Sequence, residues 1–411
     1  MPIGKLESIN EFRGFTGQKD GPVKINGAGL DASEACDLAC PHCYRPPGAG
    51  KAGYLLPEIA SKTMRKLREA GVTEVYFLGA EPTQNPDLPQ LLQEAVNLGF
   101  KFVLLISHGL RFADEAYARQ VLIPGVSLLM HRHTIDDDTL AEKIQDVSVG
   151  KLGTLQNSHA AWRNAERIFK EKGGDRLMMQ CCLTDAVMNN GNLSRVFRWA
   201  RESLGTKPIM EYVSPPNESY DRQIEWLTTY PLLTKRIVVQ MEEFIEIDRE
   251  IGLILPTYND AVSPQAYDEA CDMIKKGGQI NNDGLYLPCT NMGRGSTNYA
   301  KFGNVLSGTF GQIEQNSIRQ AFLEQGFRIQ SCKELCRGSG CWWTGLVTTG
   351  CYRLCQLNCI FNEEKKTIDD MPDLCGDCSL DLLRQEGVIK CGLDTRPGLA
   401  LGEMEKTIFK V

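Results

Sequence analysis

The chain has 411 residues, 42% of them hydrophobic, which is enough to bury more than one core. Its formal net charge is −7 without a run of lysine or arginine, which argues against a nucleic-acid binder held by phosphate contacts. No secretory apolar core and no bilayer-length apolar run is present, so no membrane partner is expected. Sixteen cysteines then favour metal or redox chemistry over disulfides, in a cytoplasmic, oxygen-sensitive protein.

Strand and helix patterns alternate from about residue 22 to residue 215. Six stretches have the pattern of buried strands, at residues 23–30, 72–78, 100–107, 125–130, 177–183 and 208–213. Four helices are expected between them, from Pro57 to a stop at Gly71, from a cap at Asp87 to Gly99, from Leu155 to Lys172, and from a cap at Asn192 to Gly205. The three aspartates at 136–138 are typical of the solvated start of a further helix.

Strands that alternate with helices predict an α/β fold with a parallel sheet, whose sites lie where loops leave the carboxyl ends of the strands. Six units suit an open partial (β/α)6 barrel of the TIM type better than a closed eightfold barrel. We expect an N-terminal extension at residues 1–22 and the barrel at residues 23–215. A helical bridge should follow at residues 216–270, and a cysteine-rich, irregular α+β domain that depends on metal at residues 271–411.

Three cysteines at spacings of four and three follow the first predicted strand, at Cys36, Cys40 and Cys43. Three thiolates can hold three corners of a [4Fe–4S] cubane and leave one iron without a protein ligand, and an open metal position is where chemistry occurs. The alternative is a zinc knuckle. Zinc prefers four closed ligands, and His42 lies too close to its cysteine neighbours to be the fourth.

The pattern CxxxCxxC resembles the signature of the radical S-adenosylmethionine (SAM) enzymes. The resemblance implies a partial barrel with the cluster loop after the first strand, as found here. It also implies a [4Fe–4S] cluster with SAM at its open iron, and one-electron cleavage of SAM to methionine and a 5′-deoxyadenosyl radical. The implied electron donor is a flavodoxin or a ferredoxin.

Other segments carry the resemblance further. The run Gly79-Ala80-Glu81-Pro82-Thr83 resembles the family's GGEPT segment, whose backbone binds the SAM ammonium group, although Ala80 replaces a glycine. The same resemblance places His42 near the adenine, Ser107-His108-Gly109 as a turn like the family's Thr-Asn-Gly, and Ser127 as a polar contact to SAM. An ordinary turn or a solvated side chain is the alternative for each.

Two further groups are candidates for catalysis. His131 and His133 flank Arg132 after the fourth strand, where they could hold an anionic substrate or move protons, with an exposed loop as the alternative. Cys181 and Cys182 are adjacent on the fifth strand, so one of them should face the barrel lumen. We take Cys182 as a candidate hydrogen-atom donor, and a buried structural cysteine is the alternative.

The C-terminal third resembles the SPASM domain, an auxiliary-cluster extension of many radical SAM enzymes, through residues 283–289 and 302–305. This resemblance implies one or two auxiliary [4Fe–4S] clusters. Gly308 stands near the place of one usual cysteine, so one cluster could be incomplete, and zinc is the alternative metal. The candidate ligands are Cys289, Cys332, Cys336, Cys341, Cys351, Cys355, Cys359, Cys375, Cys378 and Cys391.

These observations predict a radical SAM enzyme that abstracts hydrogen from an unactivated C–H bond. The first expectation is a peptide or protein substrate that is crosslinked, oxidised or epimerised. About 22 residues precede the first strand, too few for a leader-peptide-binding domain. The runner-up is oxidation or rearrangement of a small molecule such as a sugar, an aminocyclitol or an amino acid. A non-catalytic cluster or zinc carrier is the remote alternative, but a carrier has no need of a SAM-binding strand end.

Overall fold

The computed structural model describes residues 25–43, 53–173, 175–188, 191–204, 209–212, 247, 250, 277–287 and 303–315. Almost all of the predicted helical bridge lies outside these residues, as does most of the cysteine-rich region. No helix in the described ranges combines the length and the apolar character that crossing a bilayer requires.

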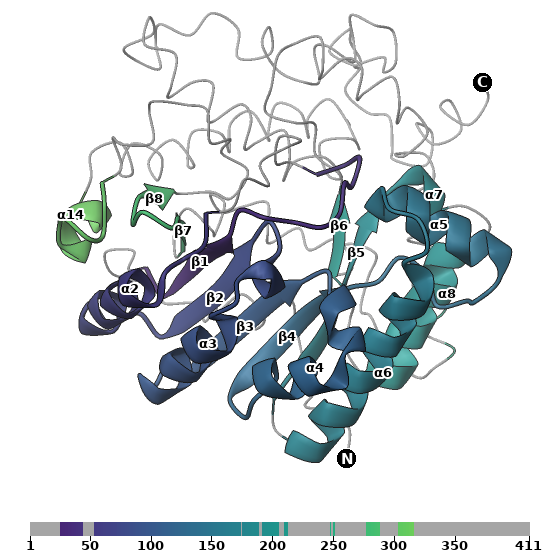
Figure 1. Cartoon of the computed structure of the whole chain (residues 1–411), viewed down its shortest axis with the longest axis horizontal. Coiled ribbons are helices and arrows are strands. Elements are labelled where there is room, and N and C mark those ends of the chain that lie inside the picture. Colours follow the sequence, from purple (N-terminus) through teal and green to yellow (C-terminus); the bar gives the residue numbers. More distant parts are fainter. Residues whose placement is uncertain are drawn as a thin grey trace, which may run out of the picture.

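The described ranges contain one eight-stranded sheet with the order β6-β5-β4-β3-β2-β1-β7-β8 (Figure 1). The first six strands pair with their neighbours in chain order, and every one of these pairs is parallel. They confirm the predicted α/β partial barrel. The strands are β1 (Gly27–Ser33), β2 (Glu74–Gly79), β3 (Phe102–Ser107), β4 (Val126–His131), β5 (Leu177–Leu183), β6 (Ile209–Tyr212), β7 (Gln279–Ile280) and β8 (Tyr286–Leu287).

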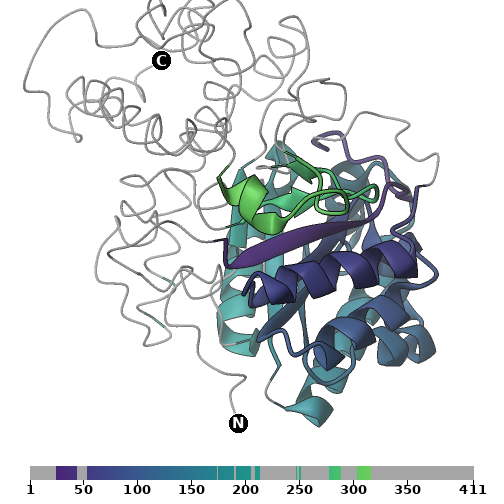
Figure 2. The same cartoon turned by 90° about the vertical axis from the view of Figure 1, so that its left-hand side faces the viewer.

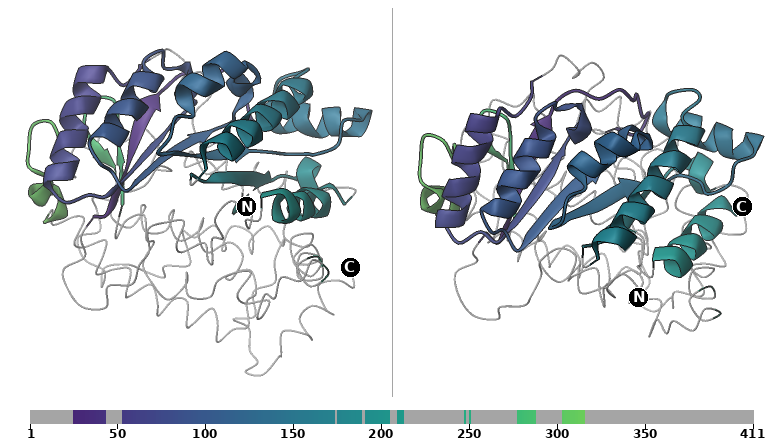
Figure 3. Two further views of the ribbon diagram at one scale, coloured as in Figure 1. Left: turned by 90° about the horizontal axis from the view of Figure 1, so that it is seen from below. Right: turned by 60° about the horizontal axis from the view of Figure 1, so that its bottom comes forward.

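Helices α2, α3, α4 and α6 lie on one face of the sheet (Figures 1 and 3). The main core fills the space between these helices and the sheet, with Trp162, Phe112 and Phe77 among its largest buried side chains. The helices are α2 (Pro57–Glu69), α3 (Leu88–Asn97), α4 (Glu115–Val121), α5 (Thr139–Val149), α6 (Leu155–Lys172), α7 (Asp185–Met188), α8 (Asn192–Trp199) and α14 (Phe310–Glu314), with short 3-10 turns η1 (Pro82–Gln84) and η2 (Leu110–Ala113) and one π turn η3 (Ala200–Leu204).

Two local expectations need correction. The first strand is shifted towards the C-terminus relative to the predicted 23–30, because β1 spans Gly27–Ser33. Asn192 is not the cap of α8, since Gly191 holds that position in a left-handed conformation with φ +65°. The Asn192 side chain instead donates hydrogen bonds to the carbonyls of His133 (2.9 Å) and Val187 (2.8 Å). It therefore ties the start of α8 to α7 and to the segment just after the fourth strand.

The opposite, inner face of the sheet carries its own small apolar cluster of Leu104, Leu129 and Met178. Side chains alternate between the two faces of a strand, so the inner face continues from Leu129 to His131 and from Met178 to Cys182. Polar groups therefore follow the apolar cluster towards the carboxyl ends of β4 and β5.

The described C-terminal segments extend the sheet past β1 (Figure 2). Strand β7 pairs parallel with β1, and β8 pairs antiparallel with β7. The ammonium group of Lys66 on α2 donates to the carbonyls of Val305 (2.7 Å), Leu306 (3.2 Å) and Gly308 (2.9 Å). Strands of two residues carry too little alternation to be recognised in a sequence, so this addition to the barrel edge was not predicted.

Candidate active site

The three-cysteine loop follows β1 and runs past the ends of the neighbouring strands towards α5 (Figures 1 and 3). Cys36 and Cys43 are exposed, Cys40 is half-buried, and none of them forms a disulfide. The amide of Cys43 donates to the carbonyl of Cys40 at 3.0 Å, which closes a tight turn between these two cysteines. The loop thus presents three reduced cysteines beside the carboxyl ends of the strands.

Asp37 anchors this loop to three other parts of the chain. Its Oδ1 atom lies 2.9 Å from His108 Nε2 and accepts from Gln84 Nε2 at 3.2 Å, while its Oδ2 atom lies 3.1 Å from Lys151 Nζ. The hydrogen bond with His108 is the main reason that the pKa of Asp37 lies well below its usual range. Burial alone would lower the pKa of His108, but Glu81 and Asp37 outweigh it and raise the pKa to about 10.

The Gly79–Pro82 segment packs directly against the residues that precede the cysteines. The amide of Ala80 donates to Ser33 O at 2.8 Å, and the amide of Glu81 donates to Ala35 O at 3.0 Å. Gly79 has φ +146°, and a Cβ atom there would lie 2.5 Å from Ser33 O. Glycine is therefore required for this close approach. An ammonium group only donates hydrogen bonds, so it would bind carbonyl oxygens of the segment, while the Ala80 and Glu81 amides are engaged within the protein.

Glu81 is a buried hydrogen-bond acceptor that joins β2 to β3. Its Oε1 atom accepts from the Thr83 amide (3.0 Å), the Thr83 hydroxyl (2.6 Å) and the Ser107 hydroxyl (2.7 Å). Its Oε2 atom accepts from the His108 amide at 2.9 Å. Only 1% of the Glu81 surface is exposed. Glu81 and Ser107 therefore hold the two strand ends together, and their polar groups are already used within the protein.

Three imidazoles and a thiol gather on the inner side of the rim. The ring of His133 lies 6.3 Å from the ring of His131 and 6.3 Å from the ring of His42, measured between centroids. The thiol of Cys182 lies 3.9 Å from His131 Nδ1. The Nδ1 atoms of His42 and His133 are buried without a hydrogen-bond partner. Burial lowers the pKa of His131 to about 3, that of His42 to about 4, and that of His133 well below 6.5.

Arg132 points away from this group. Its guanidinium lies 3.9 Å from the centre of the Trp199 ring, and its Nε atom donates to Thr134 O at 3.1 Å. The residue is 7% exposed and lies between the sheet and the helices. The hypothesis that two histidines and an arginine together hold an anion is therefore wrong for Arg132, because strand alternation sends its side chain to the opposite face.

Cys181 and Ser127 also lie away from the rim. Cys181 belongs to the core between sheet and helices, whereas Cys182 occupies the inner face. Ser127 lies near the amino end of β4, where its hydroxyl accepts from the Arg176 amide at 3.3 Å. It is four residues before His131, or about 13 Å along an extended strand. We therefore leave Ser127 out of the site. The candidate auxiliary ligands, from Cys289 to Cys391, lie outside the described residues.

The donor set of the cysteine loop fits an iron–sulfur cluster. Burial, together with the neighbouring Cys43 and Cys36, raises the pKa of the Cys40 thiol to about 12, so a thiolate there requires a bound cation. Cys36, Asp37 and His108 also lie close enough to share one ion. However, the Asp37 carboxylate is already paired with Lys151 and His108, which opposes a zinc site built on it.

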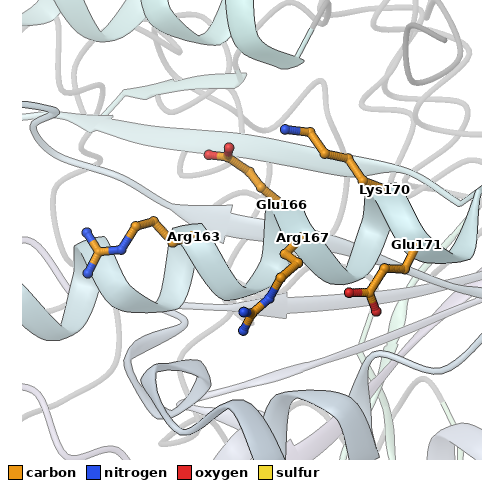
Figure 4. A pocket seen from close by; sticks show the side chains of 5 residues that line it. All are labelled: Arg163, Glu166, Arg167, Lys170 and Glu171. Carbon is orange, nitrogen blue, oxygen red and sulfur yellow. The ribbon is translucent and has the colours of Figure 1, made fainter.

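A shallow hollow lies on the outer face of α6 (Figure 4), lined by Arg163, Glu166, Arg167, Lys170 and Glu171. Its charges pair with neighbours on α4, as in the contacts of Arg119 with Glu171 and of Arg167 with Glu115. This arrangement is typical of a solvated helix face, and the hollow is not part of the site.

Comparison with known proteins places this site in context. The family model described as "Radical SAM superfamily" matches residues 31–181. The chain is 26% identical over 182 residues to 7,8-dihydro-6-hydroxymethylpterin dimethyltransferase of Methanocaldococcus jannaschii. This match covers 43% of this chain and 34% of that protein. It is 29% identical over 147 residues to PqqA peptide cyclase of Granulibacter bethesdensis, and this match covers 35% of this chain and 36% of that protein. The chain therefore spans about a third of the length of these curated relatives.

A solved structure has a similar fold. Native anSMEcpe with bound AdoMet and Cp18Cys peptide aligns with a TM-score of 0.58 and 15% sequence identity. The alignment covers 91% of this chain and 100% of that chain.

Asp37, Gln84 and Lys151 were missed at the sequence level as parts of the site, and His108 was noted only as part of a turn. Asp37 lies inside the cysteine pattern and could have been singled out there. Nothing in the sequence links it to Lys151, which is 114 positions away.

Proposed function

We propose that this chain is a radical SAM enzyme that modifies a peptide or protein, because the family model described as "Radical SAM superfamily" matches residues 31–181. Members of this family bind a [4Fe–4S] cluster and SAM, which together supply a 5′-deoxyadenosyl radical that abstracts a hydrogen atom. One observation carries the proposal: three cysteines, none of them in a disulfide, lie on a loop that is anchored to the ends of β2 and β3. Cys36, Cys40 and Cys43 are the proposed ligands of that cluster.

The surrounding residues have separate proposed roles. Carbonyl oxygens of the Gly79–Pro82 segment bind the SAM ammonium group, and Glu81 with Ser107 holds that segment in place. His42 lies in the cysteine loop with a buried Nδ1 atom that has no partner, which suits a hydrogen bond to the adenine. These assignments follow the resemblance in the motifs and are consistent with the observed positions.

His131, His133 and Cys182 are the proposed contacts to substrate, because they occupy the inner face at the carboxyl ends of β4 and β5. Their burial keeps the imidazoles neutral, so they donate and accept hydrogen bonds and do not act as cations. A neutral His131 accepts from the Cys182 thiol and orients it. In an epimerisation, that thiol would transfer a hydrogen atom to the substrate carbon radical. The resulting thiyl radical would then take one electron from the external donor and one proton to restore the thiol.

The peptide substrate is supported by the similarity to PqqA peptide cyclases, which extends to 32% identity over 171 residues for the protein of Streptomyces rochei. A second candidate is a small molecule, because a similar region occurs in the pterin dimethyltransferase. One or two auxiliary clusters on the C-terminal cysteines, and a flavodoxin- or ferredoxin-type donor, belong to the proposal as well.

The test is anaerobic reconstitution, followed by addition of SAM and dithionite and measurement of 5′-deoxyadenosine, iron and zinc. Deoxyadenosine with roughly twelve irons per chain would support the enzyme with two complete auxiliary clusters. Deoxyadenosine with roughly four to eight irons would support the enzyme with partial or zinc-filled C-terminal sites. A chain that binds zinc at the cysteine loop and releases no deoxyadenosine would contradict the proposal. Mass spectrometry of candidate peptides, sugars and pterins then separates the two substrate classes.

A further inference from the structure

The turn after α5 contacts the cysteine loop through its backbone. The amide of Ala39 donates to the carbonyl of Val149 at 3.1 Å. Val149 is the last residue of α5, and the last carbonyls of a helix have no partner within the helix. The loop between Cys36 and Cys43 therefore satisfies an end of α5 that would otherwise need another partner.

Gly150 makes this contact possible. It adopts a left-handed conformation with φ +64°, and a Cβ atom there would lie 2.1 Å from the Ala39 carbonyl oxygen and 2.6 Å from the Ala39 carbonyl carbon. Both of these atoms belong to backbone, so a side chain could be accommodated only if the loop moved. Gly153 in the same turn is also left-handed, with φ +70°, but it has no atom within 4 Å of its Cβ position. It is a natural control for conformational strain without steric collision.

Charged side chains add a second connection at the same place. Lys151 Nζ lies 3.1 Å from Asp37 Oδ2, and His108 Nε2 lies 2.9 Å from Asp37 Oδ1. Asp37 is thereby held from two sides, by the turn after α5 and by the end of β3.

We propose that residues 149–151, which we call the docking turn, preorganise the cysteine loop so that its three thiols are in place before a cluster is assembled. Gly150 and Lys151 are positioning residues in this proposal, and they act through Ala39 and Asp37. The inference rests on the proposed function only for its last step, cluster assembly. The ordering of the loop by the docking turn is measured separately, on the metal-free chain.

The experiment measures amide hydrogen exchange of the full-length, metal-free protein under anaerobic conditions, for wild type, Gly150→Ala and Gly153→Ala. In Gly150→Ala we expect exchange at residues 36–43 to accelerate by about fivefold, the effect of losing one hydrogen bond of ordinary strength. Exchange in α6 should remain unchanged, which distinguishes loss of docking from general unfolding. Gly153→Ala should exchange like wild type at residues 36–43.

Cluster assembly provides the second measurement. After addition of iron and sulfide, Gly150→Ala should incorporate the loop's cluster more slowly than Gly153→Ala, as followed by iron content and by visible absorbance. Equal loop exchange in the two variants would overturn the proposal. If wild type itself binds no iron at this loop, the proposed function fails, whereas the exchange measurement still decides whether the turn orders the loop.

Asp37→Asn keeps the experiment decisive if Gly150→Ala does not fold. This change keeps the side-chain shape and removes the charge that faces Lys151 and His108. Faster exchange at residues 36–43 with unchanged exchange in α6 would support the docking turn. Exchange equal to that of wild type would overturn it.

Discussion

Glu81→Gln tests whether the buried carboxylate holds the strand ends together. The carboxylate accepts four hydrogen bonds, three at Oε1 from Thr83 and Ser107 and one at Oε2 from the His108 amide. Glutamine offers only one acceptor atom. If its carbonyl replaces Oε1, its NH2 group faces the His108 amide, and two donors oppose each other in a buried place.

The expected cost follows from these contacts. A hydrogen bond to a charged group contributes roughly 1.5–3 kcal/mol, and a buried donor left without a partner costs about 1–3 kcal/mol. The remaining three bonds weaken because the acceptor is now neutral. We therefore expect Glu81→Gln to lower the free energy of unfolding by about 2–4 kcal/mol.

The assay is urea unfolding of the metal-free protein, with the midpoint and the slope compared between variant and wild type. Glu115→Gln is the matched control, because that carboxylate is 40% exposed and pairs with Arg119 on the surface. Exposed ion pairs contribute little, so the control should unfold like wild type. A Glu81→Gln protein that also unfolds like wild type would refute the assignment of Glu81 as the connection between β2 and β3.

Three further predictions follow from other contacts. Cys40→Ala should abolish 5′-deoxyadenosine formation, since it removes one of three cluster ligands, and product equal to wild type in the purified variant would exclude that role. Lys66→Met should speed proteolysis within residues 303–315, because three carbonyls lose their shared donor, whereas Lys62→Met on the exposed face of α2 should not. Burial holds the pKa of His133 well below 6.5 in the folded chain. Below pH 6.5 the unfolded chain therefore binds one more proton than the folded chain, and the free energy of unfolding falls as the pH drops. His133→Gln should reduce that fall by up to about 1.4 kcal/mol per pH unit in acid unfolding curves, and an unchanged slope would show that His133 is protonated in the folded chain.

The barrel was predictable because its signals are local and repeat. Helix α6 and strand β5 have the bounds expected from the sequence, Leu155–Lys172 and Leu177–Leu183, since long apolar periodicity and flanking glycines define them. Helices α4 and α7 were not predicted, because helices of seven and four residues carry too few turns for a periodic pattern. The strands β7 and β8 were not predicted either, because two residues are too few for an alternating pattern.

The part of the site that one sequence motif defines, the cysteine loop, was predictable. The cysteine spacing indicated the loop, and strand alternation required one of Cys181 and Cys182 to face the lumen. The outward direction of Arg132 follows from the same alternation, but it requires knowing where β4 ends relative to the rim. The anchoring of Asp37 depends on residues that the fold brings together from three separate segments, and no single-sequence pattern reports such contacts.

The central claim is that the loop from Cys36 to Cys43 holds a cluster with an iron open to SAM. The most direct measurement is the electron paramagnetic resonance spectrum of the reduced, reconstituted protein before and after addition of SAM, for wild type and for Cys40→Ala. We predict that SAM changes the g values of part of the wild-type signal and that Cys40→Ala lacks this SAM-sensitive part. A wild-type spectrum that SAM leaves unchanged, in protein that contains the cluster at this loop, would contradict the account.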